Sequence, residues 1–178
     1  KDGQFLKIIS RKGQAPGERS SPVNIFIDGK DRIYVSDVEN NRLSISSREG
    51  SLVNSCSLKE YSAGRIVGVT PGGDLILIVN KFSSASDKNF IVLDYFVNVY
   101  SAGFDFIKNI YVVSIPIMQQ FVKEGRRISL GALFPKSLCC VMDSSGNVYL
   151  GESQEYKIQV YSPEGKLIRR ILREGEPE

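Results

Sequence analysis

The sequence predicts an all-β repeat fold in which short antiparallel strands form sheets of four. Three segments share one pattern, a strand, a tight turn at or beside glycine and a returning strand: LSISSREGSLVNS at 43–55, VNVYSAGFDFIKNI at 97–110 and IQVYSPEGKLIRRI at 158–171. A partial copy, KDGQFLKII, occupies residues 1–9. Self-similarity at a period of roughly 20–50 residues is typical of solenoids and propellers, whose units bury their apolar faces against one another.

The first complete unit, residues 21–60, shows the four strands in order. SPVNIFI at 21–27 leads through the polar turn DGKD at 28–31 into RIYVSD at 32–37, which is rich in β-branched and aromatic residues. Turn formers at 38–42 separate it from LSIS, and the turn at Gly50 returns the chain through SLVNSCSL. DGKD faintly suggests calcium, but it lacks the other ligands of a twelve-residue loop, so we interpret it as a strand-linking turn.

The second unit, 61–114, and the third, 136–178, repeat this order with different loops. The second has RIVGV at 65–69, LILIV at 75–79, a long polar loop at 80–89, and then FIVLDYFVNVY with its turn at Gly103. The third has SLCCVMD at 137–143, VYLGES at 148–153, IQVYS and the turn at Gly165. Residues 1–20 are expected to end a preceding unit and link it to the first. Residues 115–135 are expected to be a linking segment, with a helical turn at 118–125 (MQQFVKEG).

Composition is that of one globular domain with a packed core: the chain has 178 residues, of which 42% are hydrophobic. Lysine and arginine number 23 and aspartate and glutamate 20, with the signs interspersed, a balance too mild to imply nucleic acid. No run approaches the roughly 18 apolar residues of a membrane span. Nor does the start of this chain show a basic segment followed by an apolar one.

Histidine is absent, which removes several chemistries from these residues. A Ser-His-Asp or Cys-His arrangement cannot be built, nor a zinc or iron site with histidine ligands. We therefore predict no catalytic residue, no metal ligand and no cofactor. Cys56, Cys139 and Cys140 are predicted to be small core residues without a disulfide, because the adjacent pair would point to opposite faces of a strand.

The repeats contain longer motifs as well. The first unit has GQAPGE at 13–18, IFID at 25–28, IYVSD at 33–37 and NNRL at 40–43, and the third has VMD at 141–143, GNVYL at 146–150 and KIQVY at 157–161. These motifs resemble NHL-type repeats of bacterial six-bladed β-propellers with GQxPGE linkers. The resemblance implies about three blades of a six-bladed ring and favours an extracytoplasmic location. It also implies either a portion of a longer propeller or self-association of two copies that completes the ring.

The resemblance also directs attention to one face of the blades. Partners of propellers usually meet the loops between second and third strands, here 37–42, 80–89 and 152–157. These loops supply the predicted binding residues: Asp37, Asn41, Arg42, Asp87, Lys88, Glu152 and Lys157. A structural alternative is that Asp37 bonds Arg42, and Glu152 bonds Lys157, to hold each loop together. Departures from the repeat include Arg19, where a phenylalanine often follows the linker, and Glu152 and Asn80 in place of aspartate.

A repeat fold without a catalytic constellation predicts a non-catalytic binding or scaffold module. Its partner is expected to be a protein or peptide, or alternatively a glycan, with nucleic acid disfavoured. One alternative is a portion of a propeller enzyme, a lyase or hydrolase, whose catalytic residues lie in other blades. Another is an RNA-binding propeller, which would need a basic face with exposed aromatic side chains. Tyrosines that recur at equivalent positions are interpreted as packing between blades: Tyr34, Tyr100, Tyr149 and Tyr161.

Overall fold

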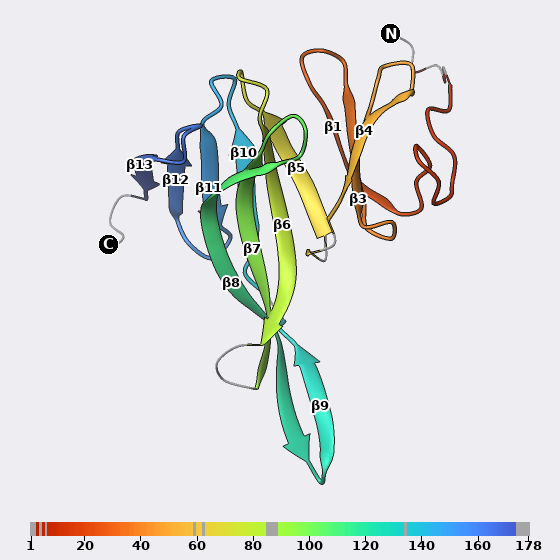
Figure 1. The fold of residues 1–178 in the computed structure, drawn as a ribbon. Helices are drawn as coiled ribbons and strands as arrows, with labels where there is room; N and C mark the ends of the chain where they lie inside the picture. The colour runs from red at the N-terminus through yellow and green to blue at the C-terminus, as the bar shows by residue number, and fades with distance from the viewer. Residues whose placement is uncertain are drawn as a thin grey trace.

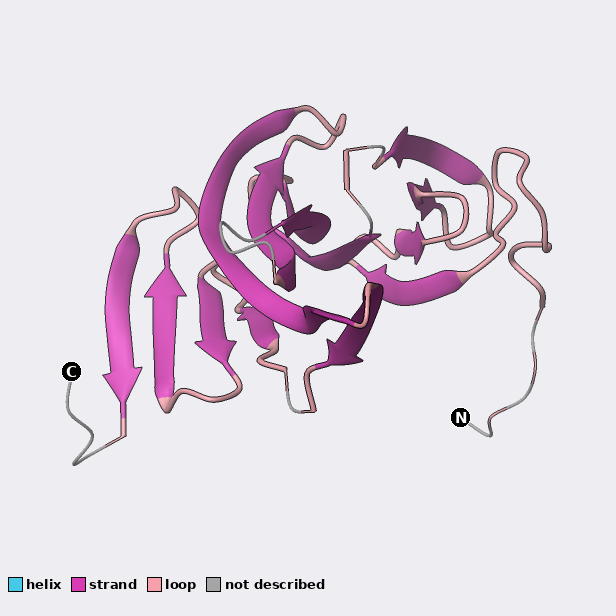
Figure 2. Cartoon of the chain, turned by 90° about the horizontal axis from the view of Figure 1, so that it is seen from below, coloured by secondary structure: helices cyan, strands magenta, loops and turns pink. Residues whose placement is uncertain are grey.

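The computed structural model describes residues 3, 5, 7–58, 60–61, 63–84, 89–133 and 135–173, which form an all-β fold of three antiparallel sheets (Figure 1). The predicted fold class is confirmed, and the sheets are arranged as propeller-like blades. Seen from below, the described chain consists of strands and connecting loops alone (Figure 2). It contains no helix with the length and apolar character that a membrane crossing requires.

Each sheet follows the order of the chain. The first contains β1 (Pro22–Ile27), β2 (Ile33–Asp37), β3 (Arg42–Ser46) and β4 (Leu52–Ser57). The second contains β5 (Ala63–Val69), β6 (Leu75–Ser84), β7 (Phe90–Tyr100), β8 (Phe106–Lys123) and β9 (Arg126–Gly131). The third contains β10 (Leu138–Met142), β11 (Val148–Glu152), β12 (Lys157–Tyr161) and β13 (Leu167–Leu172).

The second sheet lies between the other two and is buried on both faces. Successive side chains of a strand point to opposite faces. Leu75 and Leu77 of β6 therefore pack with Tyr34 against the first sheet, whereas Ile76 and Ile78 pack against the third. This arrangement explains why LILIV is continuously apolar rather than alternating. On the inner side, β5 contacts β1, β2 and β10.

The outward faces of the first and third sheets expose apolar side chains. Val23, Ile25 and Ile27 alternate along β1 with residues that face the second sheet, and each is more than half exposed. On the third sheet, Val141 is 64% exposed and Ile158 42% exposed. The array therefore presents an apolar face at each end.

The three repeated hairpins share one turn, formed by β3–β4, β7–β8 and β12–β13. In each turn the amide of the fourth residue donates to the carbonyl of the first, a serine, at 2.9, 2.9 and 2.8 Å. The fourth residues are Gly50, Phe104 and Gly165, with φ of 92°, 73° and 79°. The left-handed position in the second turn therefore falls on Phe104 and not on Gly103, the turn glycine predicted from the sequence. A side chain in that conformation costs about 1–2 kcal/mol.

The β1–β2 and β10–β11 turns share a second feature, an aspartate that accepts hydrogen bonds from its own turn. Asp28 Oδ1 accepts from the amides of Lys30 and Arg32, both at 2.9 Å, and its Oδ2 accepts from the Tyr34 hydroxyl at 3.0 Å. Asp143 repeats the pattern with Ser145, Asn147 and Tyr149. The carboxylate at 28 is thus occupied by its own turn, as the strand-linking interpretation predicts.

Two sequence-based expectations for the second sheet are wrong. Strand β6 continues to Ser84, so the first part of the expected 80–89 loop is strand; residues 85–88 lie outside the described chain. Residues 115–131 are not a linking segment with a helical turn but the end of β8 and all of β9. Glu124 and Gly125 join these strands with positive φ at both positions, 52° and 74°. That is the geometry of a tight two-residue hairpin turn.

The paired ends of β8 and β9, from Met118 opposite Gly131 to Lys123 opposite Arg126, extend away from the three sheets (Figure 1). This hairpin, residues 118–131, is called the β8–β9 arm below. Strand β9 is the last strand of its sheet, so one of its edges is unpaired within the described chain.

Candidate functional site

The described loop-face residues lie at equivalent places in the first and third sheets. Asp37 and Glu152 end β2 and β11, and Arg42 and Lys157 begin β3 and β12. Asp87 and Lys88, the other two predicted binding residues of this face, lie outside the described residues. The hydrogen bonds around each loop show what these side chains do in the free protein.

Asp37 is buried and accepts four hydrogen bonds. Its donors are the backbone amides of Ser20 (2.6 Å), Ser21 (3.0 Å) and Asn40 (3.1 Å), and the Asn40 side-chain amide (2.8 Å). Burial by itself raises the pKa of Asp37, but these hydrogen bonds outweigh it and hold the pKa below its ordinary value. The carboxylate is therefore a charged anchor for the segment that precedes β1.

Arg42 binds the same segment from the other side of the loop. Its guanidinium donates to the carbonyls of Glu18 at 2.8 Å, Ala15 at 3.3 Å and Gln14 at 3.4 Å. Among the described residues, Asp37 and Arg42 form no ion pair with each other, so the direct bond offered as the structural alternative is wrong. Both residues instead fasten the GQAPGERSS linker, residues 13–21, to the first sheet.

Asn41, between them, occupies a left-handed position, with φ of 45°. Its carbonyl accepts from the Leu58 amide at 2.9 Å, which connects the loop to the end of β4. Its side-chain oxygen is buried without a hydrogen-bond partner. Asn41 is thus a loop-shaping residue, with an acceptor that remains unpaired.

Arg19, the departure from the usual linker, lies under the loop. It is 8% exposed and donates from Nη2 to the Ser46 hydroxyl at 3.1 Å. Burial lowers the pKa of Arg19, the charge of Asp37 opposes this effect, and the charge of Arg42 adds to it. The guanidinium thus lies in the outward face of the first sheet, among residues that the linker covers.

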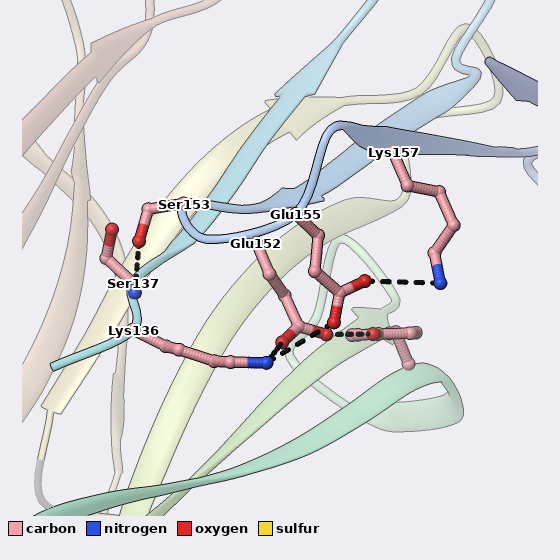
Figure 3. Close-up of polar contacts among 7 residues, drawn as sticks. Lys136, Ser137, Glu152, Ser153, Glu155 and Lys157 are labelled. Carbon is pink, nitrogen blue, oxygen red and sulfur yellow. Dashed lines mark hydrogen bonds and ion pairs between the residues drawn. The ribbon is translucent and has the colours of Figure 1, made fainter. Parts of the chain in front are cut away.

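In the third sheet the corresponding loop carries a charge network (Figure 3). Lys136 reaches both Glu152 and Glu155 at 3.3 Å, and Lys157 pairs with Glu155 at 3.2 Å. The predicted Glu152–Lys157 bond is therefore wrong, because Glu155 pairs with Lys157 instead. Hydrogen bonds from Lys157 and Lys136 lower the pKa of Glu155, and those to Glu155 and Glu152 raise the pKa of Lys136.

Tyr111 of β8 connects this network to the second sheet. Its hydroxyl donates to Glu152 Oε1 at 2.9 Å, and its ring packs on that of Tyr161 with centroids 6.1 Å apart. Burial, followed by the hydrogen bond to Glu152, raises the pKa of Tyr111 well above its ordinary value. Glu152 is thus occupied by Tyr111 of β8 and by Lys136, which precedes β10. Within the described chain, no group of three or more carboxylates and thiols could hold a metal ion.

A feature that the sequence did not reveal is a pocket of about 540 Å³ between the first and second sheets. It lies beside the end of β4 and the β7–β8 turn, and half of its lining residues are aromatic. The lining residues are Cys56, Ser57, Leu58, Glu60, Tyr61, Tyr100, Phe104 and Phe106. A sequence signal did exist: aligning the three turns puts phenylalanine at 104 where the other two have glycine.

The fold defines an all-β protein of propeller-like sheets. No family model matches the chain, and no curated protein matches it. Among solved structures, Kuenenia stuttgartiensis hydrazine synthase is similar with 10% sequence identity over 87% of this chain and 75% of that chain, at a TM-score of 0.31.

Proposed function

We propose that this protein is a non-catalytic binding module and that its β8–β9 arm contacts a protein partner. The observation that carries the proposal is the arm itself, a projecting hairpin that exposes apolar side chains on both faces, among them Val122 at 72% on the face opposite Phe121. Pairing places Phe121 opposite Ile128 and Gln119 opposite Leu130. Phe121, Ile128 and Leu130 are exposed, Leu130 to 56%. Apolar side chains gathered on an exposed hairpin are typical of a surface that contacts another protein.

The tip of the arm adds charge to this apolar stripe. Lys123 and Arg126 pair across the last rung, on the same face as Phe121 and Ile128. Both are exposed, and neither has an ion-pair partner among the described residues. A complementary partner would offer apolar side chains bordered by carboxylates, a combination common at protein interfaces. The unpaired edge of β9 gives such a partner backbone groups for strand addition.

The predicted loop-face site receives less support. Asp37 and Arg42 are engaged with the linker, and Glu152 and Lys157 with the charge network, so a ligand would have to displace internal bonds. The arm needs no such displacement. A protein or peptide partner therefore fits the arm better than it fits the loop face.

Site-specific cross-linking tests this proposal. A photoreactive benzoylphenylalanine replaces Ile128 or Leu130 on the arm and, as a control, Val53, which is exposed on β4 to 58%. Cross-links from the arm positions to one defined protein, absent from position 53, are expected. Leu130→Glu and Arg126→Glu should then weaken binding of that purified protein at least about tenfold, with Val53→Glu unchanged. Equal cross-linking from all three positions, or turnover of a substrate without any partner, would contradict the proposal.

The apolar end faces support a second proposal, self-association of two copies. Ile25 on the first sheet and Val141 on the third are 61% and 64% exposed, and joining such faces buries both. Sedimentation velocity on the wild type, Ile25→Glu and Val141→Glu decides the matter. A dimer that either substitution dissociates is expected, whereas a monomeric wild type at high concentration contradicts self-association.

A further inference from the structure

The aromatic pocket between the first and second sheets has the features of a ligand site separate from the arm. Four rings line it: Tyr61 follows β4, Tyr100 ends β7, Phe104 lies in the β7–β8 turn, and Phe106 begins β8. Its volume of about 540 Å³ falls in the range of roughly 300–1,000 Å³ typical of small-molecule pockets.

Phe104 is the residue that turn geometry does not require. The equivalent turns place Gly50 and Gly165 at the left-handed position with the same hydrogen bond, so glycine satisfies this turn. Phenylalanine there takes φ of 73° and a strained backbone, and in return adds a ring that packs partly on the core and lines the pocket. Strain of this kind is concentrated at functional sites.

The tyrosine rings are fixed in place by hydrogen bonds behind the pocket. Asn98 of β7 is 1% exposed and donates its side-chain amide to the hydroxyls of Tyr61 at 3.3 Å and Tyr100 at 3.2 Å. Its own oxygen accepts from Asn109 of β8 at 2.8 Å. Phe106 meets Tyr100 edge to face, with centroids 5.8 Å apart. The pocket walls are therefore ordered in the absence of a ligand, and this reduces the loss of conformational entropy on binding.

Charge decides which ligand such walls suit. Glu60 is the one charged residue in the described lining. Burial raises the pKa of the Cys56 thiol to about 11, so that this group is neutral at pH 7. Aromatic faces and a carboxylate both attract cations and repel anions. A primary ammonium would lose hydration that one carboxylate cannot replace, whereas a methylated ammonium has no N–H to satisfy and gains apolar contact with the rings.

We propose that this pocket binds a small quaternary ammonium compound, with the cation against the rings of Tyr61, Tyr100, Phe104 and Phe106 and with Glu60 at its border. This inference is independent of the arm and of any protein partner. It explains with one ligand the strained Phe104, the ordered rings of Tyr61 and Tyr100, and the Glu60 carboxylate.

A matched pair of probes tests it. Choline and its neutral carbon isostere, 3,3-dimethylbutan-1-ol, have the same shape and differ in the charge of one atom. Isothermal titration calorimetry and chemical-shift perturbation of the pocket residues should show choline bound at least about tenfold more tightly than the isostere. Equal affinities would overturn the cation assignment and leave a hydrophobic pocket, and no saturable binding of either probe would overturn the site.

Variants locate the effect. Phe106→Leu and Glu60→Gln should each weaken choline binding about five- to tenfold while the protein remains folded by circular dichroism. Phe82→Leu, an exposed aromatic position on β6, and Glu49→Gln, on the first outer turn, are matched controls expected to bind as the wild type does. Phe104→Gly restores the residue of the sister turns and should lose binding with its hairpin intact. Unchanged affinity in all three pocket variants would overturn the proposal.

Discussion

Replacing Asp37 tests whether the predicted loop-face carboxylate is a structural anchor. Asp37→Ala leaves three backbone amides, those of Ser20, Ser21 and Asn40, without their acceptor. Hydrogen bonds to a charged group contribute about 1.5–3 kcal/mol each, but Ser20 and Ser21 are half-buried, so water replaces part of the loss. We expect a decrease of about 3 kcal/mol in the free energy of unfolding.

Urea unfolding followed by circular dichroism measures this difference, since the chain has no tryptophan. Asp105→Ala is the control, because Asp105 is exposed and its side chain accepts from one serine hydroxyl; its change should stay within about 0.5 kcal/mol. Hydrogen exchange at Ser20 and Ser21 should accelerate in Asp37→Ala alone. Equal stability of the two variants, with unchanged hydrogen exchange at Ser20 and Ser21, would refute the anchoring role and leave Asp37 free to bind a partner.

Three further predictions concern packing and protonation. The pKa of Asp37 in the folded protein lies below its unfolded value of about 3.9. The stabilisation by this carboxylate is therefore complete above that pH and is lost as the pH falls through the folded pKa. Between pH 7 and pH 3, the urea midpoint of Asp37→Asn should fall less steeply than that of the wild type. Gly68→Ala brings a methyl group against the flexible end of the Met142 side chain between the second and third sheets. Because that end can move aside, the substitution should cost about 1 kcal/mol in urea unfolding, whereas Gly131→Ala, which meets open space, should cost nothing measurable. Tyr111→Phe removes a hydroxyl that joins these sheets and should lower the free energy of unfolding by about 1 kcal/mol, a value that a null result in thermal denaturation would contradict.

The sequence predicts the repeated hairpins because their information is local. Serine at the first turn position, glycine at or beside the fourth and flanking β-branched residues favour the turn without reference to the rest of the chain. The sequence does not predict the arm, because apolar and polar residues do not alternate strictly along MQQFVKEG. The Glu-Gly pair before Arg126 nevertheless resembles the short turns that favour hairpins. The elongation of β6 and β7 follows from their pairing with each other, a long-range effect that composition alone does not show.

The loop-face residues illustrate the same limit. Asp37 and Arg42 are close in sequence, so a direct bond between them is the simplest expectation. Apart from Asn40, which also bonds Asp37, their actual partners lie 16 to 28 residues away, in a linker whose path over the first sheet is set by tertiary packing. Likewise, Lys157 pairs with Glu155 because the loop places Glu155 between Glu152 and Lys157. Sequence spacing alone does not specify that placement.

The length of β7 and β8 has a structural consequence. Both strands run from the region of the arm to the wall of the aromatic pocket, β7 from Phe90 to Tyr100 and β8 from Lys123 back to Phe106. Their pairing contains three β-bulges. Toward the pocket, both strands are buried in the core through Val97 and Ile110. The arm and the pocket are therefore joined by one continuous pair of hydrogen-bonded strands, and the bulges are the places where this pair bends. The pocket lies at the other end of this strand pair, where Tyr100 is paired with Phe106.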